Sequence, residues 1–111
     1  KAVSLQPESG YIVDSLAWGL FKLGKYEAAI PHMEKAAELM PVDPIVMDHL
    51  GDLYWAVGRQ LEAKFQWRRA LSFDPEPKDA TRIREKLRVG LDRVLVSEGS
   101  KPTSELYAND N

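Results

Sequence analysis

The chain has 111 residues, 44% of them hydrophobic, and a formal net charge of −2 at pH 7. This length is typical of one domain, which can bury roughly two-thirds of the surface that its unfolded chain exposes. The sequence has no cysteine and no uninterrupted apolar run of about 18 residues, which excludes disulfides, thiolate chemistry and a transmembrane helix in this chain.

The first predicted element is a helix over residues 11–23, in which apolar residues recur at helical spacing. These residues are Ile12, Leu16, Leu20 and Leu23. Ser9 is a favourable N-cap residue before this helix, and Gly24 is a stop signal after it. A second helix is predicted over residues 26–40, with Pro31 near its start, where a missing N–H is tolerated. Together the two segments predict an antiparallel helix pair.

The sequence then repeats itself at a period of 34 residues. The matched pairs are Leu16 and Leu50, Gly24 and Gly58, Ala29 and Ala63, Ala36 and Ala70, and Pro41 and Pro75. Asp43 is a favourable N-cap residue, and Pro44 suits the first turn of the helix that opens the second copy. Small residues such as Ala29 and Ala63 stand where two helix backbones approach closely. The period therefore predicts a second antiparallel helix pair.

The residue types at fixed positions of this repeat resemble the tetratricopeptide repeat family, whose pattern is W-x2-L-G-x2-Y, then A-x3-F, then P. Residues 44–77 read Met47-x2-Leu50-Gly51-x2-Tyr54, then Ala63-x3-Trp67, then Pro75. Residues 10–43 read Val13-x2-Leu16-Ala17-x2-Leu20, then Ala29-x3-Met33, then Pro41. The resemblance implies an all-α fold of antiparallel helix-turn-helix repeats. We expect two full repeats, 10–43 and 44–77, plus a C-terminal capping helix, in a short right-handed superhelix.

The segment after Pro77 predicts one more helix, of about 17 residues, with a single apolar stripe. The stripe consists of Ala80, Ile83, Leu87, Leu91, Val94 and Leu95. The repeat register is lost here, because Arg84 and Glu85 stand where the repeats carry Leu-Ala or Leu-Gly. We interpret residues 78–96 as a capping helix, which covers the last apolar face of a repeat array. The polar residues 97–111 are expected to be a largely disordered tail.

The 34-residue offset also runs backwards, since Ala2, Leu5 and Pro7 match Ala36, Leu39 and Pro41. Residues 1–9 are therefore expected to be the end of a truncated repeat, and residues 1–96 one repeat domain. An open end leaves an apolar stripe of residues 11–23 uncovered, which predicts weak self-association there. The truncated start predicts a fragment of a longer protein. Trp55 and residues 65–71 resemble those of bacterial repeat proteins, which implies a bacterial source.

The resemblance also implies a binding site, because in this family the first helix of each repeat lines a concave groove that holds peptides. The groove positions are Tyr11, Asp14, Ser15, Trp18 and Phe21 in the first repeat, and Asp48, His49, Asp52 and Trp55 in the second. The Lys, Arg and Asn clamp with which relatives hold a peptide carboxylate is absent, since Asp14, Trp18 and His49 stand there. Carboxylates beside aromatic rings favour a basic partner. The alternative is that Trp18 and Trp55 pack against neighbouring helices or the capping helix.

Charge is distributed unevenly, with −4 over residues 1–58 and +4 over residues 59–96. Such a distribution either reflects solvated helices or steers an asymmetric partner or a head-to-tail contact. The basic residues Arg82, Arg84, Lys86 and Arg88 are interrupted by Asp79, Glu85 and Asp92 and have no interleaved aromatic residues. Nucleic acid is therefore not the expected partner.

The strongest catalytic candidate is the D-H-x-x-D motif of Asp48, His49 and Asp52. Asp48 and Asp52 share a helix face, but His49 points roughly 100° away from Asp48 and a fourth ligand is missing, so no metal site is predicted. No catalytic residue and no cofactor are predicted either. The sequence thus indicates a non-catalytic module that binds a peptide or protein segment in its groove. The alternative is a structural spacer within a longer superhelix.

Overall fold

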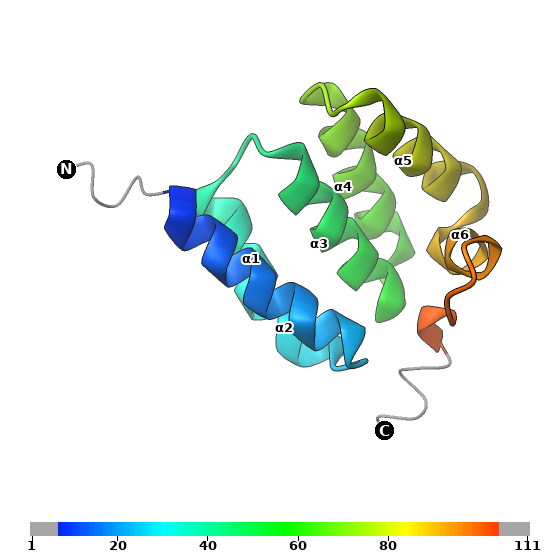
Figure 1. The fold of residues 1–111 in the computed structure, drawn as a ribbon, viewed down its shortest axis with the longest axis horizontal. Helices are drawn as coiled ribbons and strands as arrows, with labels where there is room; N and C mark the ends of the chain where they lie inside the picture. Colours follow the sequence, from blue (N-terminus) through cyan, green and yellow to red (C-terminus); the bar gives the residue numbers. More distant parts are fainter. Residues whose placement is uncertain (1–6, 105–111) are drawn as a thin grey trace.

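The computed structural model describes residues 7–104, which form six α-helices joined by short turns (Figure 1). The helices are α1 (Pro7–Lys22), α2 (Tyr26–Leu39), α3 (Pro44–Ala56), α4 (Gln60–Ser72), α5 (Pro77–Val89) and α6 (Leu91–Ser97). Helix α1 pairs with α2 and α3 with α4, while α2 also packs on α3. The predicted all-α architecture of packed helix pairs is therefore confirmed.

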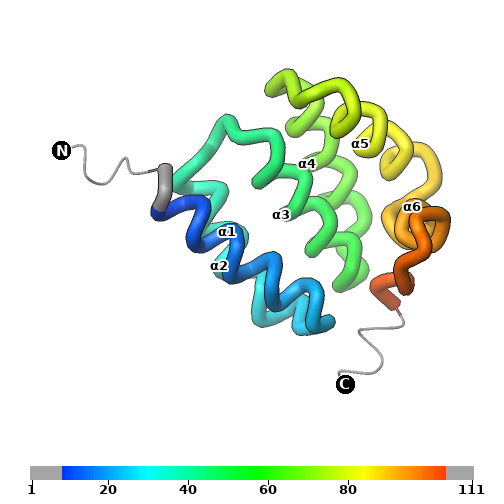
Figure 2. Tube along the Cα trace, in the orientation of Figure 1, coloured from blue at the N-terminus to red at the C-terminus, as the bar shows by residue number. Residues whose placement is uncertain are grey.

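The helices lie in two layers, which the trace in Figure 2 makes plain. Helices α1, α3 and α5 form one side of the molecule, and α2 and α4 lie behind them. We call the side formed by α1, α3 and α5 the groove face. None of the helices in the described part of the chain is both long and apolar enough to cross a membrane.

The repeat boundaries follow from local backbone chemistry. Gly24 and Gly58 adopt φ angles of 80° and 89°, which glycine reaches without a Cβ clash, and they follow α1 and α3 respectively. Asp43 caps α3 as predicted, because its carboxylate accepts the N–H of Ile45 at 2.8 Å and that of Val46 at 3.3 Å. Helix α2 continues through Pro31. Each repeat is thus one helix pair with a defined turn.

The start of α1 differs from the prediction. The helix begins at Pro7, so Ser9 lies inside it and is not its N-cap. Proline at the first helical position needs no N–H partner and has a φ angle already suited to a helix, which allows the earlier start. The proposed remnant of a preceding repeat lies largely in residues 1–6, outside the described part of the chain.

The core lies between the paired helices and depends on small residues at the contacts. Ala17, Ala29, Ala63 and Ala70 are fully buried. Gly51 also lies at a close approach, since a Cβ there would lie 2.5 Å from the ring of Trp67. The small residues of the repeat therefore set the spacing between helix axes, as predicted.

The C-terminal region differs from the single predicted capping helix. Gly90, with φ of 91°, separates α5 from α6. A Cβ at Gly90 would lie 2.7 Å from ring atoms of Trp55, so the backbone contacts that ring directly. This contact requires glycine, and glycine at positive φ ends α5.

Residues 97–104 also differ from the expected disordered tail. Thr103 is only 2% exposed, and its backbone N–H donates to Asp92 Oδ1 at 2.9 Å. The hydroxyl of Tyr26, at the start of α2, donates to the carbonyl of Thr103 at 3.3 Å. This segment therefore folds back and joins α6 to the first helix pair, while residues 105–111 lie outside the described residues. The polar composition of this segment gave no indication that Thr103 forms hydrogen bonds with Asp92 and Tyr26.

Candidate functional site

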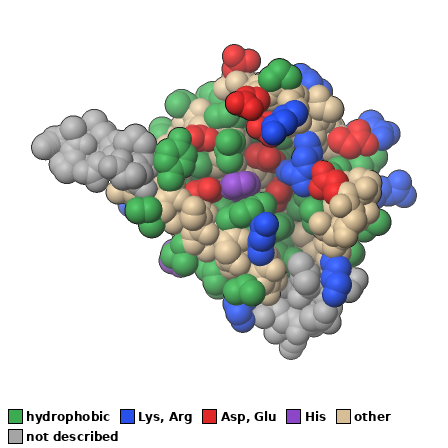
Figure 3. All heavy atoms as spheres, viewed as in Figure 1, with side chains coloured by type: hydrophobic (Ala, Val, Ile, Leu, Met, Phe, Trp, Pro, Cys, Tyr) green, Lys and Arg blue, Asp and Glu red, His purple; other side chains and the backbone are tan. Residues whose placement is uncertain are grey.

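The nine predicted groove residues all lie on α1 and α3, but their environments differ widely. Tyr11 and Ser15 are exposed, whereas Phe21 and Asp52 are buried; the remaining five are half-buried. On the groove face, acidic side chains gather over the centre and upper part, and basic ones follow its right and lower edges (Figure 3). The face is therefore not uniformly acidic.

One cluster of predicted residues joins α1 to α3. His49 Nδ1 lies 2.8 Å from Asp14 Oδ1. The ring of Trp18 stacks with that of His49, with 3.9 Å between centroids, and with that of Phe21, with 4.4 Å. The structure thus brings Asp14, Trp18, Phe21 and His49 together, and it uses His49 in a contact between repeats.

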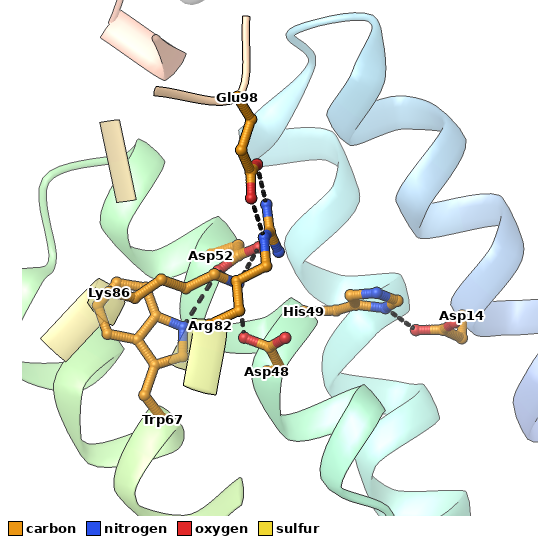
Figure 4. A network of polar contacts seen from close by, with 8 residues as sticks. All are labelled: Asp14, Asp48, His49, Asp52, Trp67, Arg82, Lys86 and Glu98. Atoms are coloured by element: carbon orange, nitrogen blue, oxygen red, sulfur yellow. Dashed lines mark hydrogen bonds and ion pairs between the residues drawn. The ribbon is translucent and has the colours of Figure 1, made fainter. Parts of the chain in front are cut away.

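The second cluster holds Asp48 and Asp52 against a lysine from α5 (Figure 4). Lys86 Nζ lies 2.7 Å from Asp48 Oδ1 and 2.9 Å and 3.1 Å from the two carboxylate oxygens of Asp52. Trp67 Nε1 also donates to Asp52 Oδ1, at 3.1 Å. The side chain of Lys86 is fully buried. This arrangement is an internal ion-pair cluster that anchors α5 to α3.

Burial and charge act in opposite directions on this cluster. Burial raises the pKa of Asp52 to about 6, and the charge of Asp48 adds to that effect while Lys86 opposes it. Burial lowers the pKa of Lys86, but the carboxylates of Asp52 and Asp48 outweigh it and hold the pKa above its ordinary value. The lysine therefore stays charged, and its charge compensates the buried carboxylates.

This cluster removes the main reason to expect a basic partner in the groove. Asp48 and Asp52 were expected to receive a basic partner, but Lys86 of the same chain already contacts both. Lys86 was not among the predicted site residues. Its signal was its position three residues after Ile83 on the apolar stripe of α5, where a buried lysine needs an acidic partner.

Trp55 packs against neighbouring helices, which is the alternative to a groove position in the sequence analysis. Its ring lies 5.7 Å from that of Trp67, measured between centroids, and contacts the backbone at Gly90. It therefore packs against α4 and against the turn between α5 and α6.

Trp18 lines a cavity of about 310 Å³ at the end of α1. The cavity is lined by Trp18, Phe21, Lys22, Tyr26, Arg82, Leu95, Glu98, Ser100, Lys101 and Thr103. Arg82 donates to Glu98 through Nε at 2.7 Å and Nη2 at 2.8 Å, and this lowers the pKa of Glu98. Burial, with a smaller effect of Asp92, raises the pKa of Tyr26 to about 12. The sequence predicted only two of these residues, Trp18 and Phe21, because six of the other eight come from the capping region and from the segment expected to be disordered.

A smaller hollow of about 150 Å³ lies between α3 and α5, and Asp48, His49, Arg82 and Ile83 are among its lining residues. Arg82 lines both hollows. Within residues 7–104, no group of three or more His, Cys, Asp or Glu side chains is placed to hold a metal ion. The groove face therefore carries two hollows, and both are lined by apolar and charged side chains.

Comparison with known proteins gives one match. A family model described as "Tetratricopeptide repeat" matches residues 15–43, which cover the second half of α1, all of α2 and the cap of α3. No curated protein and no solved structure matches the chain.

Proposed function

Since this chain is a tetratricopeptide repeat protein, we propose that it is an interaction module that binds a segment of a partner protein on the groove face. Repeats of this family generally serve protein interaction. The observation that carries the location is the 310 Å³ cavity, where aromatic rings and charged side chains of three distant segments meet. Its volume is at the lower end of the roughly 300–1,000 Å³ range of ligand pockets.

The proposed role is non-catalytic. His49, Asp14, Asp48 and Asp52 engage one another or Lys86, so their polar atoms serve to join helices. Among the described residues, no buried side-chain nitrogen or oxygen lacks a hydrogen-bond partner. A bound segment would therefore use the surface that these clusters shape and leave the clusters intact.

The proposed partner is not defined by basic side chains. The preference for Lys or Arg rested on available carboxylates, and on this face Lys86 binds Asp48 and Asp52 while His49 binds Asp14. Lys86 contacts both carboxylates from inside the molecule, and the side chains of Asp48 and Asp52 are only 16% and 2% exposed, so a second cation would have little access to them. The partner must therefore be recognised by other features.

The test is a titration of a mixed peptide library against the isotope-labelled domain, followed by NMR. Binding on the groove face should shift the backbone signals of α1, α3 and α5 and the indole signal of Trp18. The exposed side chains of Leu61 and Phe65 on α4 provide the control surface on another side of the molecule. Shifts confined to α4 would overturn the assignment of the face, and a library without any effect would favour a structural spacer.

Self-association is a second candidate, favoured by one observation on α1. Tyr11, Ile12 and Leu16 are 53%, 68% and 51% exposed, an apolar stripe of the kind that mediates contacts between proteins. We propose that two copies meet weakly along this stripe. Sedimentation velocity over a concentration series should show an average mass that rises with concentration in the wild type and stays constant in the double variant Ile12→Ser, Leu16→Ser. A wild type that stays monomeric throughout would exclude this contact.

A further inference from the structure

The apolar stripe of α1 occupies a position that a neighbouring helix covers in the next repeat. Ile12 and Leu16 are exposed, whereas the equivalent side chains of α3 are buried where α2 packs on that helix. Gly19 lies one turn further along the stripe, and a Cβ there would meet no atom within 4 Å. Glycine inside a helix costs helix stability but lets another backbone come close. The stripe is therefore suited to receive a second helix.

The other end of the array carries an open hollow on α6. In the order of the helices, α6 follows α5 as α4 follows α3, and α1 and α6 are the outermost helices of the row (Figure 2). Leu91 and Val94 turn one side of α6 into the protein and are buried. The hollow, of about 350 Å³, is lined by Asp92, Arg93, Val96 and Ser97, and Val96 is 57% exposed. This side of α6 is therefore an exposed, partly apolar surface.

We propose that the α1 stripe of one copy of this chain docks on the α6 hollow of a second copy, so that copies associate head to tail. The inference rests on the proposed self-association and names the surface that receives the stripe. The contact is heterologous, because it joins two different surfaces. Each pair of copies therefore leaves one stripe and one hollow open for further copies.

The internal packing of the array is the first reason for this arrangement. Within the chain, the second helix of each pair packs on the first helix of the next, since α2 packs on α3 and α4 packs on α5. Helix α6 of a neighbouring copy would precede α1 in the same way. A head-to-tail contact thus extends a packing that the chain already uses twice, and it covers Ile12 and Leu16 as α2 covers their counterparts.

The distribution of charge is the second reason. Residues 1–58 carry a net charge of −4 and residues 59–96 carry +4. A head-to-tail contact places the acidic half of one copy beside the basic half of the next, where the exposed Arg93 lines the hollow. A contact between two α1 stripes would instead bring two acidic halves together. Complementary charge favours the first arrangement and like charge disfavours the second.

Two variants of the 111-residue chain test the contact, each blocking one end. The stripe variant is Ile12→Ser with Leu16→Ser, and the hollow variant is Arg93→Glu with Val96→Ser. Sedimentation velocity over a concentration series is run on the wild type, on each variant and on an equimolar mixture of the two variants. The wild type should associate, and added salt should weaken this association because it screens the charges.

The mixture gives the decisive result. We expect each variant alone to stay monomeric, because each lacks one of the two surfaces that the contact joins. In the mixture the intact hollow of the stripe variant meets the intact stripe of the hollow variant, so the average mass should rise towards twice that of the monomer. This rescue also shows that both variants have kept their fold.

Arg68→Glu with Phe65→Ser on α4 is the matched control for the hollow variant. Phe65 is 57% exposed, as Val96 is, and Arg68 is exposed as Arg93 is. The two pairs have the same spacing and the same change of charge, but the α4 pair does not line the hollow. The control should therefore associate as the wild type does.

The other outcomes overturn the inference in distinguishable ways. A hollow variant that associates like the wild type would leave a contact between two α1 stripes, so the proposed self-association would stand without α6. A mixture that stays monomeric would exclude the head-to-tail contact. A stripe variant that still associates, or a wild type that stays monomeric, would overturn the proposed self-association as well. The proposed interaction module is tested separately, by the peptide titration.

Discussion

Helices α1 and α3 occupy the same register of the 34-residue repeat, yet their matched positions have different surroundings. Ile12 and Leu16 are 68% and 51% exposed, whereas their counterparts Val46 and Leu50 are 1% and 4% exposed. The difference arises because α2 packs on α3, while these α1 side chains have no such cover in the described structure. A repeat pattern therefore defines where a side chain points, and the neighbouring element defines whether it is buried.

The groove positions show the same contrast. Trp18 of α1 and Asp52 of α3 are 34 residues apart and so match each other in the repeat. Lys86 of α5 seals Asp52 inside the molecule, while Trp18 lines an open cavity. One half of the groove face thus joins helices, and the other half is the surface on which we propose that a partner binds.

The largest effect is expected from removing the cation that seals α3. Lys86→Met should lower the free energy of unfolding by about 3–5 kcal/mol, because it leaves two carboxylates, one fully buried, without their compensating charge. Arg88→Met is the control, since that side chain is 70% exposed and pairs with the exposed Glu85 within the described residues. Its unfolding midpoint should stay close to that of the wild type, because solvent screens an exposed ion pair. Denaturant unfolding of both variants checks the prediction, and equal midpoints would contradict it.

A matched truncation tests the contrast in burial. Leu50→Ala should cost about 2–5 kcal/mol, because it leaves a cavity in a packed contact. Leu16→Ala, at the equivalent position of α1, should cost less than about 1 kcal/mol, since half of that side chain is already in water. Thermal and denaturant unfolding give both values. A similar loss in both variants would mean that α1 is covered as α3 is.

The buried carboxyl of α3 should also give stability a distinctive pH dependence. Burial raises the pKa of Asp52 from 3.8 to about 6, so the folded state binds this proton more tightly than the unfolded chain. Its stabilising contribution is complete below about pH 4 and is lost as the pH rises through 6. Relative to Asp52→Asn, the wild type should therefore lose up to about 3 kcal/mol of unfolding free energy across this window.

Denaturant titrations at pH 4, 5, 6 and 7 measure this difference. Asp74→Asn is the control, because Asp74 is exposed and its positive φ of 59° accepts asparagine well. Its profile should run parallel to that of the wild type. A parallel profile for Asp52→Asn as well would show that the buried carboxyl titrates as it does in the unfolded chain.

The smallest effects are expected from alanine substitutions of two glycines, and these effects should have opposite signs on α3 and α1. Gly51→Ala should cost about 1–3 kcal/mol, because the new Cβ would lie 2.5 Å from the ring of Trp67 and 3.1 Å from the carbonyl of Ala63. Gly19→Ala on α1 meets nothing within 4 Å and should gain about 0.5–1 kcal/mol from helix propensity. Opposite shifts in melting temperature are expected, and shifts of the same sign would mean that the two helices pack alike.

The sequence by itself determined the helix pairs. The spacing of apolar residues, the cap at Asp43 and the glycines after α1 and α3 are local features, because each acts through backbone groups only a few residues away. The repeat period added the positions of close helix contact. These features do not depend on which other helices pack nearby, so they can be predicted without knowing the fold.

Only the tertiary structure decided which groove residues are available. Lys86 meets Asp52 and Asp48 across 34 and 38 residues, and Tyr26 meets Thr103 across 77 residues. The break at Gly90 depends in the same way on the ring of Trp55 from another helix. Such contacts depend on how whole helices pack, and neither helical periodicity nor polar composition encodes that packing locally. The sequence places Asp48 and Asp52 on one helix face, but their contact with Lys86 and the cavity beside Trp18 emerged only from the folded chain.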